Sequence, residues 1–417
     1  MQRYRTVICG AGIAGVATAY YLSRATDSGS VLLLDKLPPL SLTTSKSGEN
    51  YRDYWPQQCM TEFSSRSLDL MEALAAEHGN VFSMREFGYQ FVSREPGRDI
   101  FGPDAGQAAG VTRELDRAAI RTRWPHLSAA IRQVVSIARA GALDVNALGS
   151  LLLAEARAAG TAVMRDEIIG LSESASGGFE IRTGQQTLAA DHLVLASGPF
   201  AAAMAAQLGV HLPVESYAQR KFVIPDPLAI IPRDMPFTIC ADPLQLDWSD
   251  GERELIGDDP AYRWLLQTFP PGLHIKPEGR DRIKLGWAFN RESESPRWDI
   301  PVDPDFPNLT IRGASQFIPG LSAYIDNVPT PVTQYAGYYT RSAENWPLIG
   351  PLNDNGLFVV SGLSGYGTMA ACAAGELCAL HIRSGALPAY GRQFHPRRYS
   401  DAAVLAEISA LDSDGQL

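Results

Sequence analysis

The residues with the clearest chemical role are three glycines and one acid near the N-terminus. Gly10, Gly12 and Gly15 form a GxGxxG pattern directly after a short apolar run that ends at Cys9. In a strand–turn–helix unit the first glycine permits a tight turn, the second lets the backbone approach a pyrophosphate, and the third lets helix and strand pack closely. Asp35 ends a second apolar run, where it can accept hydrogen bonds from a ribose. The pattern predicts an adenine-dinucleotide site; the alternative is an ordinary glycine-rich turn.

The elements that must position these residues alternate between apolar strands and helices in three separated parts of the chain. In the second part, Asp144 can cap a helix that Gly160 ends. Short apolar runs bounded by turn residues read as buried strands. The expected elements are a strand over 6–9, a helix over about 13–24, a strand over 31–34 and a helix over 64–77; a helix over 145–159, strands over 161–164, 178–181, 187–189 and 191–195; and a strand over 356–362 with a helix over 368–382.

The stretches between these parts have a different composition. Residues 81–140 and 215–330 are richer in proline, aromatic and charged residues and contain alternating runs such as Arg282–Trp287. Alternation of this kind is typical of an antiparallel sheet with one covered face. We therefore expect an α/β fold, in which a Rossmann-type nucleotide-binding domain carries an inserted antiparallel-sheet substrate domain (α+β). The nucleotide-binding domain would comprise residues 1–80, 141–214 and 331–417, and the substrate-binding domain residues 81–140 and 215–330.

Bulk properties narrow the class of protein. The chain has 417 residues, 20% of them charged, and a net charge of −10, which argues against nucleic acid or an anionic membrane surface as a partner. No apolar run is long enough for a membrane span, and the first strand starts so close to Met1 that we expect no signal peptide and a cytoplasmic protein. The five cysteines form no CxxC pair and the histidines no HxH or HxxxH pair, so we expect neither a disulfide framework nor a metal site. The polar tail 412–417 is expected to fray.

Several longer motifs resemble one family in the same order along the chain. These are VICGAGIAG, LDVNALGSLLLAEARAAG, HLVLASGPF, YYTRSAENWPLIGPL and GLFVVSGLSGYG. The sequence is similar to the flavoproteins of the D-amino-acid oxidase type, which include sarcosine oxidases and glycine oxidases. The resemblance implies FAD as cofactor, an inserted sheet that roofs the flavin, and oxidation of a C–N bond in an amine or amino acid by hydride transfer to flavin N5. The expected product is an imine, with O₂ as acceptor and H₂O₂ as by-product.

The resemblance also assigns the cofactor contacts. Gly10, Gly12 and Gly15 would hold the pyrophosphate, Asp35 the adenosine ribose, and Ile168 the adenine through its backbone. Thr44 and Ser45 would lie along the pyrophosphate, and a helix would begin beside the flavin ring, where its N-terminus stabilises negative charge. The remaining matches to the cofactor site are Ile13, Ala14, Lys36, Ala196, Ser197, Gly198, Gly365, Tyr366, Gly367, Thr368 and Met369.

The sharpest catalytic candidate is Lys284. IKLGWAFN resembles the strand of sarcosine oxidases whose lysine sits over flavin N5 and promotes reaction with O₂. A buried ammonium at that place stabilises developing negative charge as an oxyanion hole does. The alternative is an exposed strand lysine on the same face as Arg282, because residues two apart share a side of a strand.

The sequence also departs from the family. Gly337 stands where sarcosine oxidases attach FAD through a cysteine, so a non-covalent cofactor is expected. Met369 replaces their carboxylate-binding lysine and Ala288 replaces the histidine after the lysine strand, which puts a small N-methylamino acid in doubt as substrate. Asn50 stands where relatives similar to D-arginine dehydrogenase carry a histidine. The side chains left near the expected flavin face include Asn50, Arg52, Tyr338 and Arg341.

Either arginine could bind a carboxylate bidentately, or lie at the surface or on an FAD phosphate. The tyrosines could position a substrate or only wall the cavity. Three other functions stay open at this point: a dehydrogenase that passes electrons to a quinone or carrier protein, a tailoring enzyme that hydroxylates or desaturates, and a non-catalytic FAD-binding subunit.

Overall fold

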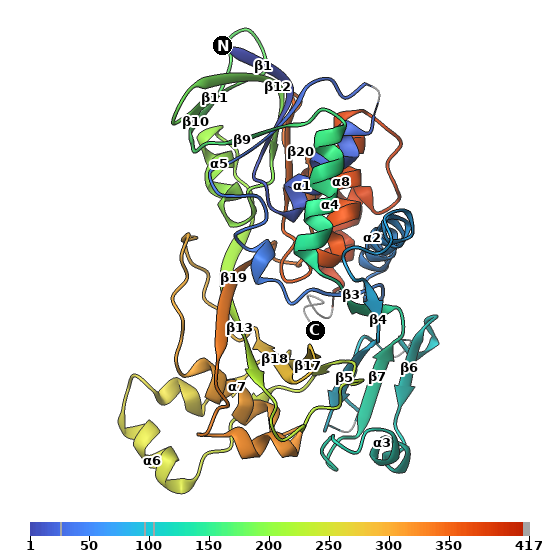
Figure 1. The fold of residues 1–417 in the computed structure, drawn as a ribbon, viewed down its shortest axis with the longest axis vertical. Coiled ribbons are helices and arrows are strands. Elements are labelled where there is room, and N and C mark those ends of the chain that lie inside the picture. The colour runs from blue at the N-terminus through green and yellow to red at the C-terminus, as the bar shows by residue number, and fades with distance from the viewer. Residues whose placement is uncertain (26, 96, 103–104, 412–417) are drawn as a thin grey trace.

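The computed structural model describes residues 1–25, 27–95, 97–102 and 105–411. The tail 412–417, for which the sequence predicts fraying, lies outside these residues. Two large sheets dominate the molecule, one in each half of the view in Figure 1, and strand β19 runs between the halves. Two cavities lie where the two halves meet.

The N-terminal glycines sit in the expected strand–turn–helix unit. Strand β1 (Gln2–Cys9) leads through Gly10 into helix α1 (Ile13–Ser23), and β2 (Val31–Asp35) follows and pairs with β1 in parallel. Gly10 has φ +110°, and a Cβ there would lie 2.5 Å from the carbonyl oxygen of Ala196. A side chain at Gly15 would overlap the carbonyl oxygen of Gly10. Both glycines are thus required by close backbone packing.

The sheet around this unit has eight strands. Its main order is β10-β11-β12-β1-β2-β9, and β21 pairs with both β12 and β20. Strands β1, β2, β9, β12 and β21 form parallel pairs, so their carboxyl ends meet at one edge of the sheet. The other bounds are β9 (Ala162–Arg165), β10 (Ile168–Glu173), β11 (Phe179–Thr183), β12 (Thr187–Leu195), β20 (Leu348–Pro351) and β21 (Leu357–Ser361).

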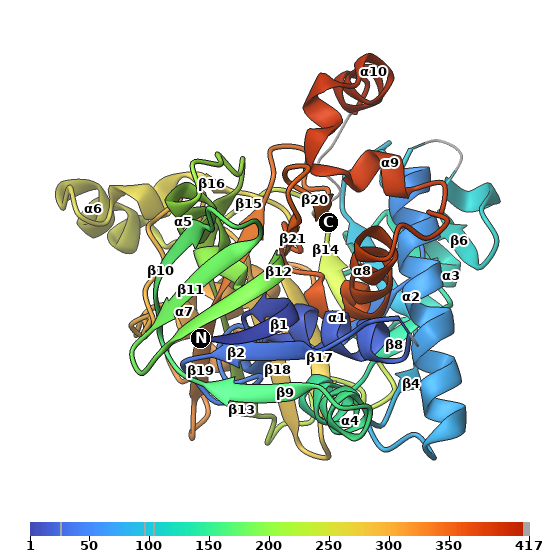
Figure 2. The same ribbon diagram turned by 90° about the horizontal axis from the view of Figure 1, so that it is seen from above.

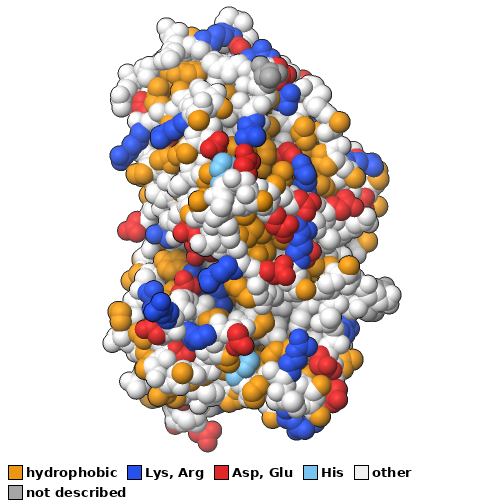
Figure 3. All heavy atoms as spheres, turned by 45° about the vertical axis from the view of Figure 1, so that its right-hand side comes forward, with side chains coloured by type: hydrophobic (Ala, Val, Ile, Leu, Met, Phe, Trp, Pro, Cys, Tyr) orange, Lys and Arg blue, Asp and Glu red, His pale blue; other side chains and the backbone are white. Residues whose placement is uncertain are grey.

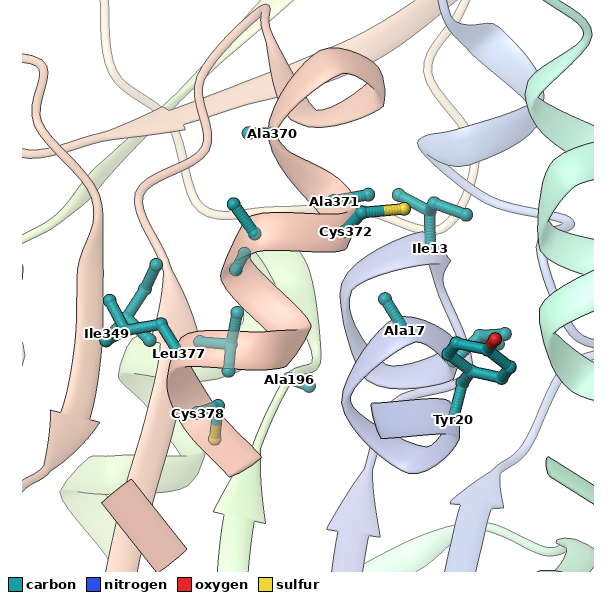
Figure 4. Packing of buried hydrophobic residues seen from close by; sticks show 14 of the residues in the cluster. Ile13, Ala17, Tyr20, Ala196, Ile349, Ala370, Ala371, Cys372, Leu377 and Cys378 are labelled. Carbon is teal, nitrogen blue, oxygen red and sulfur yellow. The ribbon is translucent and has the colours of Figure 1, made fainter. Parts of the chain in front are cut away.

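Three helices pack together on one face of this sheet (Figures 1 and 2). They are α1, α4 (Val145–Ala158) and α8 (Gly367–Ile382), and α2 (Gln58–Glu77) packs against α8. Asp144 caps α4 as expected, because its Oδ1 accepts from the backbone N–H of Ala147 at 2.8 Å. Figure 4 shows α8 beside α1, where small side chains let the two backbones approach closely. A Cβ at Gly375 would lie 2.5 Å from the carbonyl carbon of Ala17.

The second sheet also has eight strands and is mainly antiparallel, in the order β19-β13-β18-β17-β14-β5-β7-β6. One face packs on α7 (Phe306–Ala314) over an apolar core that contains Phe222, Ile283 and Trp287. Strand β18 (Arg282–Trp287) coincides with the alternating run that predicted it. The other bounds are β5 (Tyr89–Ser93), β6 (Val111–Glu114), β7 (Gln133–Ile137), β13 (Glu215–Pro225), β14 (Phe237–Cys240), β17 (His274–Glu278) and β19 (Thr333–Arg341).

The predicted α/β class with an inserted antiparallel sheet is confirmed. The topology adds one detail to the expected division, because β19 lies after residue 330 yet pairs with β13 along its whole length. A small sheet of β3 (Asn50–Arg52), β8 (Ala140–Ala142) and β4 (Arg85–Glu86) lies between the large ones. The outer elements are α3 (Arg117–Arg123), α5 (Ala201–Gln207), α6 (Asp250–Asp258), α9 (Gly391–Phe394), α10 (Ala402–Ser409), β15 (Leu244–Gln245) and β16 (Thr268–Phe269).

The surface carries charges of both signs. On the face shown in Figure 3, basic and acidic side chains are interspersed over both halves of the molecule. Within the described ranges, every helix falls short of the length and apolar character that crossing a bilayer requires.

Candidate active site

A cavity of about 370 Å³ lies at the carboxyl edge of the parallel strands. The N-termini of α1 and α8 reach its wall through Gly12 and Ile13 on one side and Gly367 and Thr368 on the other. Two helix N-termini direct positive partial charge into the same space. The cavity is therefore suited to an anionic ligand that extends along the sheet edge. We call it the cofactor cavity.

The glycine turn leaves room for such a ligand. Gly12 has extended backbone (φ −70°, ψ 177°), and a Cβ there would meet only the Thr44 hydroxyl, at 3.5 Å. The fold itself therefore tolerates a side chain at Gly12, while the cavity that Gly12 lines would be narrowed by it. Ala14 also lines this wall, whereas Gly15 serves the packing of α1 on the turn.

Asp35 lies at the end of β2 and lines the cofactor cavity. Its Oδ2 accepts from the backbone N–H of Ala11 at 2.7 Å and its Oδ1 from that of Leu37 at 2.9 Å. These bonds fix the carboxylate against the glycine turn, and each oxygen keeps lone pairs for a ribose hydroxyl. The neighbouring Lys36 lines the same wall and pairs with Glu167 at 3.0 Å.

The side chains of Thr44 and Ser45 point in different directions. The Thr44 hydroxyl accepts from the backbone N–H of Ile13 at 3.0 Å and lines the cavity. The Ser45 hydroxyl instead donates to the backbone carbonyl of Ser41 or Leu42, at 2.8 and 2.9 Å, and Ser45 is not part of the cavity wall. Thr44 therefore faces the cavity, whereas a turn of 3₁₀ helix points Ser45 back along the chain.

The Ile168 end of the cavity is closed by aromatic side chains that the sequence did not indicate. Ile168 lines the wall together with Phe200 and Trp298. The rings of Phe200 and Trp298 stack with centroids 4.1 Å apart and an interplanar angle of 17°, and the Lys36 ammonium lies 3.8 Å from the Trp298 ring centroid. Trp298 belongs to the long connection after β18. Residues that follow strands of both large sheets therefore meet at this end of the cavity.

Two buried hydroxyls in the cavity wall indicate that the cavity is suited to a polar ligand. Ser197 Oγ and Thr43 Oγ1 are buried and have no hydrogen-bond partner within the described part of the chain, and both residues line the cavity. A buried hydroxyl without a partner costs free energy, which a ligand oxygen or nitrogen would recover. With Ala196 and Gly198 beside Ser197, this wall fits the phosphate and sugar part of a dinucleotide.

A second cavity, of about 310 Å³, adjoins the first, and we call it the substrate cavity. The two share wall residues at the far end from Ile168, where Gly365 and Tyr339 meet: a Cβ at Gly365 would lie 2.5 Å from the Tyr339 ring. From the predicted loop, Gly365 lines both cavities, whereas Tyr366 and Met369 line the substrate cavity alone. The shared residues are Ser47, Gly48, Lys221, Tyr339, Ser364 and Gly365.

Arg52 lines the substrate cavity, as does Asn50 on the same short strand. The guanidinium of Arg52 lies 4.1 Å from the Trp55 ring centroid and 5.1 Å from that of Phe91. Burial lowers the pKa of Arg52 to about 10, so the group remains charged near neutral pH. A planar cation fixed among aromatic faces is suited to recognising a carboxylate.

His274 is a cavity residue that sequence reasoning missed. It lies on β17 opposite Gly286 of β18, and its ring fills the space that the missing side chain of Gly286 leaves. Burial, followed by the charge of Lys221, lowers the pKa of His274 to about 3, so the ring is neutral. Its Nδ1 lies 2.9 Å from the carbonyl oxygen of Gly272 and therefore carries the proton, which leaves Nε2 as an acceptor.

Three buried lysines lie on one face of the second sheet, and only one of them reaches the cavities. The Lys284 ammonium pairs with Glu49 at 3.3 Å and Glu278 at 3.2 Å, and Lys284 lines neither cavity. Lys276 donates to the carbonyl oxygen of Gly48 and to Asn50, and Lys221 lines both cavities.

The charges around these lysines explain their different states. Burial lowers the pKa of Lys276 to about 7, with the charge of Lys284 as a further cause. Burial also acts to lower the pKa of Lys284, but Tyr335, Glu278 and Glu49 outweigh it and raise that pKa above its usual value. Lys284 is therefore buried, and it is paired with carboxylates away from the wall of either cavity.

Tyr338 and Arg341 lie outside the substrate cavity. The Tyr338 hydroxyl donates to Glu294 at 2.9 Å and accepts from the backbone N–H of Arg297, and the residue lines the cofactor cavity only. The Arg341 guanidinium lies 4.9 Å from the Tyr217 ring centroid and lines neither cavity. Strand alternation puts Tyr338 on the opposite face of β19 from Tyr339, which lines the shared wall. Arg341 is the last residue of β19 and lies beyond that wall.

Neither cavity has a cysteine in its wall, and the described residues hold no cluster of metal-ligand side chains. All five cysteines are buried and reduced, and none lines a cavity wall. Burial raises the pKa of Cys59 to about 12, which is typical of inert structural thiols. In the part of the chain that the structure describes, no three His, Cys, Asp or Glu side chains are grouped to hold a metal ion.

Comparisons with known proteins place this site in context. A family model described as FAD dependent oxidoreductase matches residues 5–380. The structure is similar to L-proline dehydrogenase from P. horikoshii, with a TM-score of 0.75 and 18% identity over 96% of this chain and 98% of that chain. It is also similar to glycine oxidase from Geobacillus kaustophilus, with a TM-score of 0.75 and 19% identity over 95% of this chain and 99% of the other.

Iminodiacetate oxidase from Chelativorans sp. BNC1 has a TM-score of 0.72 and 17% identity over 94% of this chain and 99% of that chain. No curated protein matches the sequence. At these identities the solved structures establish the shared fold, and the family model establishes the kinship over most of the chain.

Proposed function

Because the chain belongs to the FAD-dependent oxidoreductase family, we propose that it oxidises the C–N bond of a small amine or amino acid to an imine. The observation that carries this proposal is the wall shared by the two cavities. A dinucleotide bound in the cofactor cavity with its adenine at Ile168 would be held past Gly12 toward Lys221, Tyr339 and Gly365, where the substrate cavity begins. A small molecule in that cavity would therefore lie against the ring end of the cofactor.

FAD is the cofactor of this family, and the chain is an oxidoreductase, as the sequence predicted. The residues proposed to hold FAD are Gly12 and Ile13 at the pyrophosphate, Asp35 at the ribose, Ile168 at the adenine, and Gly365 and Thr368 beside the ring. Bound FAD supplies the acceptor for a hydride from the substrate carbon. We expect FAD to be bound without a covalent link to the protein, since Gly337 stands where sarcosine oxidases have the cysteine that attaches FAD.

The chain's own residues would bind and orient the substrate. Arg52, charged and enclosed by Trp55 and Phe91, is placed to hold a carboxylate. His274 Nε2 can accept a hydrogen bond from a substrate N–H, because Nδ1 is held by Gly272. The aromatic wall excludes water, and proximity and orientation then account for much of the rate. We propose that Arg52, and not Arg341, is the substrate arginine.

The test begins with the purified protein and FAD. A flavin spectrum is expected, and anaerobic addition of amino acids and secondary amines should bleach it for at least one compound. Arg52→Met should weaken the apparent affinity for that compound by roughly tenfold to a hundredfold if it carries a carboxylate, since a charge-assisted bond is worth about 1.5–3 kcal/mol. Arg341→Met is the matched control and should change little. An FAD-loaded protein that no amine reduces would refute the proposal.

We propose O₂ as the electron acceptor, with H₂O₂ as product. Mixing the reduced protein with air-saturated buffer should restore the oxidised spectrum rapidly and release H₂O₂. Slow reoxidation by O₂ together with rapid reoxidation by a quinone would instead identify a dehydrogenase.

A further inference from the structure

Lys221 is the buried cation that lies between the two cavities. It belongs to β13, and its side chain shares a sheet face with Lys284 and Lys276. Its relative exposure is 7%, comparable with 6% for Lys284 and 5% for Lys276. Of the three, Lys221 lines both cavities and the other two line neither. The three lysines are therefore equally buried, but only the side chain of Lys221 borders a space that a ligand could occupy.

The partners of the three ammonium groups differ in kind. Lys284 has two carboxylates, and Lys276 has a backbone carbonyl and an amide oxygen. Lys221 donates to the Tyr339 hydroxyl at 3.3 Å, and within the described residues no carboxylate lies within ion-pair distance of it. An ammonium buried without a counter-charge is costly unless a ligand supplies the charge.

The fold holds Lys221 in this position from two sides. Its stem occupies the space over Gly286, where a Cβ would lie 2.9 Å from Lys221 Cγ. On the other side, a Cβ at Gly48 would lie 3.4 Å from Lys221 Cε. Two glycines thus clear a channel that points the ammonium toward Tyr339 and the shared wall.

We propose that Lys221 supplies the fixed positive charge that stabilises the cofactor when it is reduced. A hydride carries two electrons and one proton, so a neutral ring that accepts one gains a single negative charge. A cation a few ångströms away in a water-excluded site favours that charged state strongly. Lys221 would therefore provide the buried positive charge beside the ring, a role for which the sequence alone suggested Lys284.

This role of Lys221 rests on the proposed function, which puts the flavin ring at the shared wall, but its test needs no substrate. The midpoint potential of FAD bound to the holoenzyme is measured by equilibration with a redox dye. Lys221→Met and Lys221→Gln should both shift the equilibrium against reduction by about tenfold or more, whereas Lys221→Arg should stay near the wild type. Using two neutral variants keeps the test valid if one of them fails to bind FAD.

The neighbouring lysines provide matched controls. Lys284→Met removes an equally buried charge from the same sheet face, and Lys276→Met removes an equally buried amine whose pKa of about 7 leaves it partly charged. Both variants should leave the potential near that of the wild type. A lowered potential in Lys284→Met with an unchanged one in Lys221→Met would overturn the inference in favour of the sequence-based candidate. An unchanged potential in the Lys221 variants with weaker binding of benzoate, used as a carboxylate probe, would overturn it in favour of substrate binding.

Discussion

Single residues in this chain divide between those that build the fold and those that leave room for a ligand. Gly15 is needed because a side chain would overlap the carbonyl oxygen of Gly10. Gly12 has ordinary extended backbone and open space at its Cβ, so its lack of a side chain serves the cavity. The same motif therefore contains two kinds of glycine, and substitution should separate them.

We expect Gly12→Ala to weaken FAD binding without unfolding the protein. The apoprotein should keep its melting temperature, while the Kd for FAD rises by about tenfold or more, equivalent to ~1.4 kcal/mol. Gly15→Ala should instead destabilise the apoprotein by at least roughly 1–3 kcal/mol, since overpacking displaces backbone. Calorimetry of the apoproteins and fluorescence titration with FAD would check both. Equal loss of stability in the two variants would contradict this division.

His274 should make stability sensitive to acid. Its folded pKa of about 3 lies below the ordinary value of 6.5, so below pH 6.5 the unfolded chain binds a proton that the folded protein does not. Stability therefore falls as pH decreases from 6.5 toward 3, by ~1.4 kcal/mol per pH unit from this group. His274→Gln should flatten that dependence between pH 7 and 5, measured by urea unfolding with FAD held in fixed excess.

The matched control for this prediction is His211→Gln, because His211 is exposed and lines neither cavity. The variant at position 211 should keep the wild-type slope. An unchanged slope in His274→Gln would show that the imidazole is protonated in the folded protein.

At the scale of elements, the connection over 288–305 joins the two halves of the molecule. The backbone N–H of Glu294 donates to the Ser216 carbonyl at 2.9 Å, and that of Asp303 donates to the Gln334 side chain at 2.7 Å. Trp298 lies between these anchors and stacks on Phe200 at the wall of the cofactor cavity. A segment that follows a strand of the second sheet thus completes the Ile168 end of the cofactor cavity.

We expect Trp298→Ala to weaken binding of the adenosine part of the cofactor. Loss of an aromatic wall should raise the Kd of the apoprotein for FAD and for ADP by roughly three- to tenfold, since aromatic contacts are worth about 0.5–1.5 kcal/mol beyond their buried area. Binding of FMN, which lacks adenosine, should not change. Trp264→Ala is the control, because Trp264 is similarly exposed (40% against 44%) and lines neither cavity. Equal weakening of FMN binding would contradict the assignment.

At the scale of the whole molecule, the C-terminal segment secures the loop that borders the substrate cavity. Arg398 is buried and donates to Glu344, to Ser342 Oγ at 3.1 Å and to the carbonyl oxygens of Pro347 and Trp346. Asn345, within the same loop, lines the substrate cavity. The wall of the site therefore depends on contacts between residues some fifty positions apart in the chain.

Removing one partner of this buried ion pair should be costly. Arg398→Met or Glu344→Gln should lower the free energy of unfolding by about 3–5 kcal/mol, because a buried charge is left without its partner. Arg397→Met is a neighbouring control, since Arg397 pairs with the exposed Asp354 and should contribute under about 1 kcal/mol. Urea unfolding of the three variants would check this. Similar losses in Arg397→Met and Arg398→Met would contradict the prediction.

Much of the fold follows from local patterns in the sequence. The glycine turn, the Asp144 cap and the alternating strand 282–287 each depend on residues close in sequence, and each is present as expected. Several predicted cofactor residues line one cavity for the same reason, since the carboxyl ends of parallel strands meet at one edge. The roles proposed for these residues stay predictions.

The sequence by itself predicted the family and its cofactor FAD, through the resemblance of its motifs to known flavoproteins. It also predicted the strand–turn–helix unit at the N-terminus, because glycine spacing and apolar periodicity are local properties. Only the tertiary structure decided which side chains meet at the shared wall. Pairing of β13 with β18 brings Lys221 over Gly286, and pairing of β17 with β18 brings His274 to the same place. Lys284 on that strand is instead held by Glu49 and Glu278. These neighbours depend on which strands pair, and the pairing of β13 with the distant β18 is not encoded by a pattern within either strand.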